Sequence, residues 1–246
     1  MHCPEESVIS TRDRVIQQIA ERIQATAGPH TVRVAVDGVD AAGKTTLANE
    51  LVGPLEERGR PVIRASIDSF HRPRVERYRQ GDMSPRGYYE DTFDYDRVCS
   101  DLLRPLGPGG SGLFRAAAFD YAADRPVEAP VQEAEPRSVL LCDGVFLLRS
   151  DLVECWDFRI VVHVSFEEAL RRGVERDAKL PGSADAARDR YERRYLAGQR
   201  IYMDVVKPMD RADLIVYNED PAAPRLVIPS RPPSVRRLRD ARYTDA

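Results

Sequence analysis

The stretch TVRVAVDGVDAAGKTT, residues 31–46, decides the fold of this chain. Its first half, TVRVAVDG, is rich in β-branched residues and indicates a buried strand. Its second half fits the pattern G-x-x-x-x-G-K-[ST] with Gly38, Gly43, Lys44 and Thr45, and a helical pattern follows. A phosphate-binding loop lies between a strand and a helix, so this context supports a P-loop that binds a nucleoside triphosphate.

The residue types of the loop suit phosphate binding. Glycines let backbone N–H groups close around phosphate oxygens where a Cβ atom would intrude, and the loop leads into a helix N-terminus. We expect Lys44 to reach the β- and γ-phosphates and the Thr45 hydroxyl to complete a Mg²⁺ shell. The predicted nucleotide-binding residues are Gly38, Asp40, Ala41, Ala42, Gly43, Lys44, Thr45 and Thr46.

Helix and strand patterns alternate along the rest of the chain. Helical patterns cover 5–27, 44–59, 94–106, 166–178 and 186–206, and we expect Pro54 to kink the second of them. Buried strand patterns cover 61–66, 138–144, 159–165 and 213–218, the last strand. This alternation predicts an α/β P-loop NTPase fold of three layers, with a central parallel sheet, helices on both faces and a helical lid. Residues 69–93 show little periodicity, which predicts a long loop without structure of its own.

Length and composition favour one globular domain over residues 1–246. A chain of 246 residues with 42% hydrophobic and 31% charged residues suits a single α/β unit. Within it we predict a core over 31–220, a lid at about 177–187 and a Pro/Arg-rich tail over 221–246. The oligomeric state stays open, a homo-oligomer included.

Charge and cysteine patterns exclude several classes of protein. The net charge of −3 is spread along the chain, which argues against a nucleic-acid partner, and we expect the basic, aromatic segment 190–202 to pack against the sheet. No apolar run approaches the roughly 18 residues of a membrane helix, and the first residues do not resemble a secretion signal. The four cysteines show no paired spacing, which is typical of a cytoplasmic protein with reduced thiols.

Two acidic residues follow buried strands and are candidates for chemistry. Asp143, at the end of strand 138–144, is expected to hold Mg²⁺, although a turn aspartate before Gly144 is the alternative. Asp68 lies just beyond strand 61–66, where a carboxylate can accept the proton of an attacking alcohol. Its alternative role is to cap a short helix that begins at Ser69.

The chain resembles the uridine kinase family, whose relatives include phosphoribulokinase and the bacterial pantothenate kinases, from about residue 31 to residue 220. GVDAAGKTT is similar to the family's phosphate loop, IDSFHRP to its second-strand motif, EDTFDYD to the segment before the next helix, CDGVFLL to its magnesium-side strand, and RRGVERD to its arginine-bearing helix. The resemblance implies ATP as phosphoryl donor, Mg²⁺, and Asp68 as the catalytic base.

The same resemblance implies that Arg172 and Arg176 face the phosphates from the lid helix. Their spacing of four residues puts both on one helix face, which supports this role independently. The alternative is a solvated face of paired charges, because acidic residues surround them in the sequence. The predicted catalytic residues are Lys44, Asp68, Arg172 and Arg176.

The acceptor side departs from the uridine kinase pattern. His71 stands where the family has Tyr, Tyr88 where it has its ribose-binding carboxylate, and Phe119 and Asp124 where it reads the pyrimidine. The predicted acceptor-binding residues are His71, Arg86, Tyr88, Tyr89, Asp91, Phe119 and Arg194. Those within 69–93 are either an acceptor pocket or a solvated flap.

Together these patterns predict magnesium- and ATP-dependent phosphoryl transfer to a hydroxyl of a nucleoside-like small molecule. A kinase for another small alcohol, of the pantothenate or ribulose-phosphate type, is the alternative within the enzyme class. A non-catalytic nucleotide-binding switch would use the same phosphate loop but needs no acceptor base.

Overall fold

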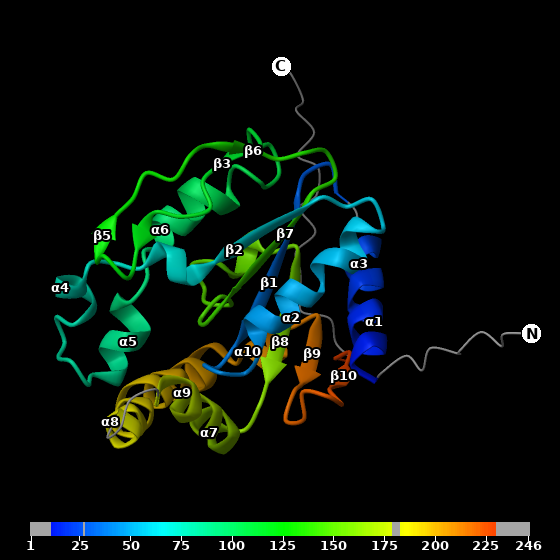
Figure 1. The fold of residues 1–246 in the computed structure, drawn as a ribbon. Helices are drawn as coiled ribbons and strands as arrows, with labels where there is room; N and C mark the ends of the chain where they lie inside the picture. The colour runs from blue at the N-terminus through cyan, green and yellow to red at the C-terminus, as the bar shows by residue number, and fades with distance from the viewer. Residues whose placement is uncertain (1–10, 27, 179–182, 230–246) are drawn as a thin grey trace, which may run out of the picture.

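A computed structural model describes residues 11–26, 28–178 and 183–229 of the chain. A six-stranded sheet forms its centre, in the order β10-β9-β8-β1-β7-β2 (Figure 1). β1 (Val32–Gly38) pairs in parallel with β7 (Val139–Gly144) and β8 (Phe158–His163), β2 (Val62–Ser66) extends the sheet beyond β7, and β9 (Leu214–Tyr217) extends it beyond β8. This mainly parallel sheet confirms the predicted P-loop α/β fold.

Helices cover both faces of the sheet (Figure 1), so the inner strands β1 and β7 are buried on both sides. Side chains alternate along a strand, so Val34 and Val36 of β1 face one apolar cluster and Ala35 faces the other. The first cluster includes side chains of α1 (Thr11–Ala25), α2 (Lys44–Glu50) and α3 (Val52–Glu56). The second includes side chains of the π-helical turn η2 (Val98–Leu103) and of α9 (Leu196–Val206).

The N-terminal half differs from the prediction at two places. The single helix predicted over 44–59 is two helices, because Pro54 has no N–H to bond the carbonyl of Glu50, where α2 ends. The prediction of a structureless loop over 69–93 is wrong. That segment follows the short 3₁₀ helix η1 (Ile67–Phe70) and contains α4 (Arg74–Arg77) and α5 (Pro85–Asp91), which are too short for periodicity to show.

Two helices predicted as continuous contain a π-helical turn. The helix predicted over 94–106 is α6 (Tyr95–Arg97) followed by η2. The helix predicted over 186–206 is α8 (Ser183–Arg190), η4 (Tyr191–Tyr195) and α9. Within η4, Tyr191 and Arg194 are both buried. Such turns occur frequently at functional sites.

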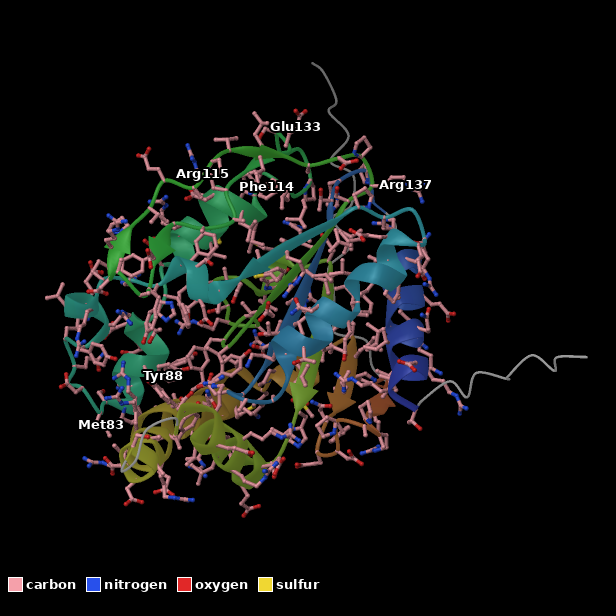
Figure 2. The ribbon with its side chains drawn as sticks, in the orientation of Figure 1. Met83, Tyr88, Phe114, Arg115, Glu133 and Arg137 are labelled. Carbon is pink, nitrogen blue, oxygen red and sulfur yellow. The ribbon has the colours of Figure 1, made fainter. Side chains whose placement is uncertain are left out.

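The remaining elements lie at the rim of the sheet. Two small ribbons are present. β3 (Leu113–Phe114) with β6 (Gln132–Glu133) lies at the top of Figure 2, where Phe114 and Glu133 are labelled, and β4 (Phe119–Asp120) with β5 (Arg125–Pro126) lies at the left, where Figure 1 labels β5. The 3₁₀ turn η3 (Val153–Cys155) precedes β8, α7 (Phe166–Asp177) follows it, and α10 (Pro208–Arg211) precedes β9. None of the helices in the described ranges combines the length and apolar character of a membrane span.

The C-terminal prediction requires a correction. The strand predicted at 213–218 is not the last one, because β10 (Arg225–Val227) pairs antiparallel with β9 and lies inside the predicted tail. Residues 230–246 of that tail, 179–182 of the predicted lid, and 5–10 and 27 of the predicted first helix lie outside the described residues. The division into one domain stays a prediction.

Candidate active site

The phosphate loop, residues 38–43, joins β1 to α2 at the carboxyl edge of the sheet. Two of its positions require glycine. A Cβ atom at Gly38 would lie 2.3 Å from the backbone oxygen of Val162, and Gly43 has a φ of +93°, which L side chains rarely adopt. Both glycines of the sequence motif therefore have a backbone reason to be there.

A cavity of about 310 Å³, which we call the phosphate cavity, lies beside this loop. Two predicted nucleotide-binding residues do not line it: Gly38 packs against β8, and Ala42 is fully buried, with its backbone oxygen 2.7 Å from Asn218 Nδ2. These two residues fix the conformation of the loop on the side that faces away from the cavity. The lining residues are Asp40, Ala41, Gly43, Lys44, Thr45, Thr46, Asp68, Asp143, Gly144, Val145, Arg172 and Arg176.

The Lys44 side chain folds back onto the phosphate loop. Its side chain is buried, and its Nζ donates to the backbone oxygen of Val39 at 2.7 Å. An ammonium group has three donors, so two remain for phosphate oxygens. Within the described residues, no carboxylate forms an ion pair with Lys44, which leaves its charge available to a ligand.

Thr45 and Asp143 meet across the sheet edge as predicted for a metal site. The Thr45 hydroxyl donates to Asp143 Oδ2 at 2.5 Å, and Arg64 Nη2 donates to Asp143 Oδ1 at 2.7 Å. The side chain of Asp143 thus points into the site, not into a turn. Sequence reasoning missed Arg64, because an arginine on a strand carries no motif; here it orients the carboxylate.

The donor set fits magnesium. A hydroxyl and a carboxylate are hard oxygen ligands, and Mg²⁺ usually combines one or two such protein ligands with phosphate oxygens and water. No group of three or more His, Cys, Asp or Glu side chains in the described ranges could hold a metal by itself. The site therefore suits an ion that arrives with a nucleotide.

Asp68 lies inside η1, directly after β2, at the same edge. Ser66 caps this turn by accepting a hydrogen bond from the backbone N–H of Asp68, so the alternative capping role of Asp68 does not apply. The Asp68 side chain opens into the cavity. Partial removal from water, with the nearby negative charges of Asp40 and Asp143, raises its pKa to about 6, against the opposing charges of Lys44 and Arg176.

Arg172 and Arg176 of α7 both line the phosphate cavity. Arg172 donates through Nε to Glu168 at 2.5 Å and through Nη2 to the backbone oxygen of Asn218 at 2.9 Å. Arg176 donates through Nε to Asp177 at 2.9 Å and through Nη2 to the Tyr191 hydroxyl at 2.7 Å. Each guanidinium keeps further N–H groups for a ligand.

A second cavity of about 320 Å³, which we call the acceptor cavity, adjoins the first. Asp40, Asp68 and Arg176 line both cavities. Of the predicted acceptor-binding residues, His71, Tyr88 and Arg194 line it. The cavity is also lined by residues for which no acceptor role was predicted, namely Arg77, Tyr78, Thr92, Phe93, Tyr121, Asp177, Tyr191 and Tyr195.

Four predicted acceptor-binding residues lie outside this cavity, and their role in acceptor binding stays a prediction. Arg86 is exposed and pairs with Glu90 at 2.8 Å. The Tyr89 ring packs edge-on against Phe146, with 5.3 Å between ring centres. The others are Asp91, which is buried and pairs with Arg79, and Phe119, which is buried in β4.

His71 and Tyr88 are neutral at physiological pH. The His71 Nδ1 donates to the backbone oxygen of Asp68 at 2.7 Å, and burial lowers the pKa of the imidazole to about 4. Burial beside Asp40 and Asp68 raises the pKa of Tyr88 well above its usual value. Tyr88 lies on the side of α5 that faces Tyr195 of η4, with ring centres 5.0 Å apart (Figure 2).

Asp40, between the two cavities, is fixed by two helices that are distant in sequence. The Tyr88 hydroxyl and Gln199 Nε2 both donate to Asp40 Oδ2, at 3.0 and 2.7 Å. Gln199 Oε1 in turn accepts from the backbone N–H of Asp40 at 3.3 Å. The loop is thereby tied to α5 and α9, a link that sequence reasoning missed because it joins residues 159 positions apart.

Comparison with known proteins agrees with this geometry. The uridine kinase of Leuconostoc citreum is 28% identical over 145 residues, covering 58% of this chain and 67% of the relative. Uridine-cytidine kinase B of Dictyostelium discoideum is 27% identical over 198 residues, covering 77% and 79%. A structure described as a possible uridine kinase from Bacillus stearothermophilus has a TM-score of 0.65 at 23% identity, covering 83% and 97%. No protein-family model matches the chain.

The expected resemblance to uridine kinases is confirmed by these relatives, and the structural neighbour confirms the fold. The relatives imply ATP as the phosphoryl donor and a divalent metal as its companion. A phosphate loop with a neighbouring carboxylate and a second cavity is the arrangement that such an activity needs. The chain is therefore an ATP-dependent small-molecule kinase similar to the uridine kinases.

Proposed function

We propose that this kinase transfers the γ-phosphoryl group of magnesium-bound ATP to a hydroxyl group of a nucleoside-like small molecule. The observation that supports the proposal most is that Asp68 lines both cavities. From there its carboxylate can accept the proton of an alcohol in the acceptor cavity while the alcohol oxygen attacks the γ-phosphate. The uridine kinase relatives and the tyrosine-rich wall of the acceptor cavity support a nucleoside-like acceptor.

Other residues of the phosphate cavity would stabilise the negative charge of the phosphates, either directly or through the metal ion. Lys44, Arg172 and Arg176 would offset the negative charge of the transferring group. Thr45 and Asp143 would hold magnesium, which when bound neutralises phosphate charge. Arg64 would keep the Asp143 carboxylate aimed at the ion through its 2.7 Å contact.

Two alternatives use the same phosphate loop. A kinase for another small alcohol would keep every residue of the phosphate cavity and differ in the acceptor cavity alone. A nucleotide-binding switch needs neither a carboxylate beside a second cavity nor the cavity itself. The wall that the two cavities share through Asp40 and Asp68 favours a kinase over a switch.

Release of ADP tests the proposal. With Mg²⁺ and ATP, we expect uridine or cytidine to raise ADP release at least about ten-fold over ATP alone. A response to pantothenate or ribulose 5-phosphate alone would support the kinase for another small alcohol instead. A chain that binds ATP but shows the same slow ADP release with every acceptor would be a switch, contrary to the proposal.

The pH dependence of the reaction should follow the ionisation of the Asp68 carboxyl group. A base works in its deprotonated form, and the pKa of Asp68 is raised to about 6, so kcat/KM should fall as the pH drops below about 6 and level off above it. Measured between pH 4.5 and 8, the acidic limb should vanish in Asp68→Asn, whose residual activity has no such proton to lose. An acidic limb that persists in that variant would assign the titration to another group.

A further inference from the structure

Arg176 is a predicted catalytic residue whose direction is not fixed by burial. It lines both the phosphate cavity and the acceptor cavity, which is where a phosphoryl group would pass from one ligand to the other. Its side chain is 58% exposed, and the carboxylate that pairs with it, Asp177, is 41% exposed. An exposed ion pair orders an arginine weakly, because water competes for both charges. A further contact is therefore needed to fix the direction of this guanidinium.

The Tyr191 hydroxyl supplies that contact. Arg176 Nη2 donates to the Tyr191 oxygen at 2.7 Å, the Tyr191 hydroxyl donates to Asp177 Oδ2 at 3.1 Å, and Arg176 Nε donates to Asp177 Oδ1 at 2.9 Å. These three hydrogen bonds form a closed set. Among the described residues Arg176 Nη1 makes no hydrogen bond, so its two N–H groups and the second N–H of Nη2 remain for a phosphate.

Tyr191 can act as an anchor because its own ring is fixed. Only 1% of the residue is exposed, and the ring belongs to the apolar cluster that includes side chains of α1 and α2. It also lies directly against α7, since a Cβ atom at Gly173 would be 2.4 Å from the ring carbon Cε1. Gly173 is three residues before Arg176 and thus on the same side of the helix. The glycine therefore lets the ring reach the part of α7 that carries Arg176.

The Tyr191 hydroxyl keeps the proton that it donates. Burial, with the nearby negative charge of Asp40, raises the pKa of Tyr191 above its usual value. Packing explains why an aromatic ring is buried here, but a phenylalanine ring would pack equally well. Within the described residues the hydroxyl bonds only to Arg176 and Asp177, so its contribution is directed at the end of α7.

We infer that Tyr191 is a positioning residue for phosphoryl transfer, whose hydroxyl holds the Arg176 guanidinium so that its remaining N–H groups can bind the γ-phosphate. The inference rests on the proposed function, in which Arg176 offsets the negative charge of the transferring group. It assigns a role to the buried tyrosine of the π-helical turn η4, which brings this hydroxyl to α7.

Tyr191→Phe tests the inference, because it removes the hydroxyl and keeps the packed ring. We expect kcat for the phosphorylated acceptor to fall at least about ten-fold and KM for the acceptor to stay within about two-fold. Calorimetry should show an unchanged affinity for magnesium-bound ADP. The preference for a non-hydrolysable ATP analogue over ADP should fall, since only the analogue carries a γ-phosphate.

A double-mutant cycle with Arg176→Met separates positioning from a purely structural role. Arg176→Met should itself lower kcat at least about ten-fold, and adding Tyr191→Phe should lower it by less than about two-fold more, because no guanidinium is left to position. Tyr217→Phe is the matched control, since Tyr217 of β9 packs against His163 and lines neither cavity. It should keep the wild-type kcat and nucleotide preference. The thermal unfolding temperature of each variant is measured alongside.

The outcomes distinguish this inference from the proposed function. A Tyr191→Phe enzyme with wild-type kcat and nucleotide preference, or with losses that multiply in full with those of Arg176→Met, overturns the inference and leaves the kinase proposal standing. A rise in acceptor KM alone would make Tyr191 an acceptor-binding residue and also overturns it. If Arg176→Met has no effect, the phosphate role of Arg176 is wrong and the inference falls with it. If no acceptor is phosphorylated, the kinase proposal fails, and the nucleotide preferences of the same variants decide the inference.

Discussion

Replacing Asp68 with asparagine should lower kcat for the phosphorylated acceptor by about 10³-fold while leaving the affinity for magnesium-bound ATP nearly unchanged. Asparagine has almost the same shape but cannot take up a proton, so the attacking hydroxyl loses its base. The carboxylate lines both cavities and is not in the phosphate loop itself, which is why nucleotide binding should persist. Steady-state kinetics with the acceptor, together with calorimetric titration of ATP, measure the two quantities separately.

The control for this variant is Asp96→Asn, because Asp96 is exposed on α6 and lines neither cavity. Its kcat should equal that of the wild type. An Asp68→Asn enzyme with more than a tenth of the wild-type kcat would show that Asp68 is not the base. Equal losses of turnover and ATP affinity would instead show that Asp68 supports the nucleotide site.

The half of the site that binds phosphate could be predicted because its chemistry is local. Gly38, Gly43, Lys44 and Thr45 lie within eight residues, and the backbone restriction at Gly43 comes from the conformation of the loop itself, although that at Gly38 comes from β8. Asp143 could be predicted for a similar reason, since the end of a buried parallel strand reaches the same sheet edge as the end of its neighbour.

Most of the acceptor half, beyond His71, Tyr88 and Arg194, could not be predicted because it is assembled from distant segments. Its wall combines α4, α5, the hairpin turn at Tyr121 and the π-helical turn η4, and none of these carries a pattern that periodicity reveals. Arg77 is an example. In the sequence it belongs to a polar stretch that is typical of a solvated flap, yet it is 5% exposed because Asp124 and Tyr121 of the hairpin cover it.

One buried carboxylate also escaped sequence reasoning. Asp37 precedes the phosphate loop and is fully buried, where it accepts from the Tyr202 hydroxyl at 2.6 Å and the backbone N–H of Leu147 at 3.1 Å. Burial raises its pKa to about 6, against those hydrogen bonds. Its place after the valines of β1 did not predict these hydrogen bonds, because only the folded chain brings Tyr202 of α9 to the end of β1.

Replacing Lys44 with methionine should lower kcat by about 10²- to 10³-fold and weaken the binding of magnesium-bound ATP as well. Methionine keeps an unbranched apolar stem of similar length in a site that is 8% exposed, so the loop should keep its shape. What is lost is the ammonium charge, which within the described part of the chain pairs with no carboxylate and is therefore free to stabilise the transferring phosphoryl group. Acceptor-dependent ADP release measures the change.

Arg97→Met is the matched control, since Arg97 is a half-exposed cation that pairs with Asp101 on its own helix face and lines neither cavity. It should keep the wild-type rate, because an exposed pair of this kind contributes at most about 1 kcal/mol to stability and nothing to the site. Lys44 and Asp68 predict different signatures: loss of the lysine should impair both ATP binding and turnover, whereas loss of the aspartate should impair turnover alone. A Lys44→Met enzyme that keeps wild-type turnover would mean that the phosphate cavity is not where ATP reacts.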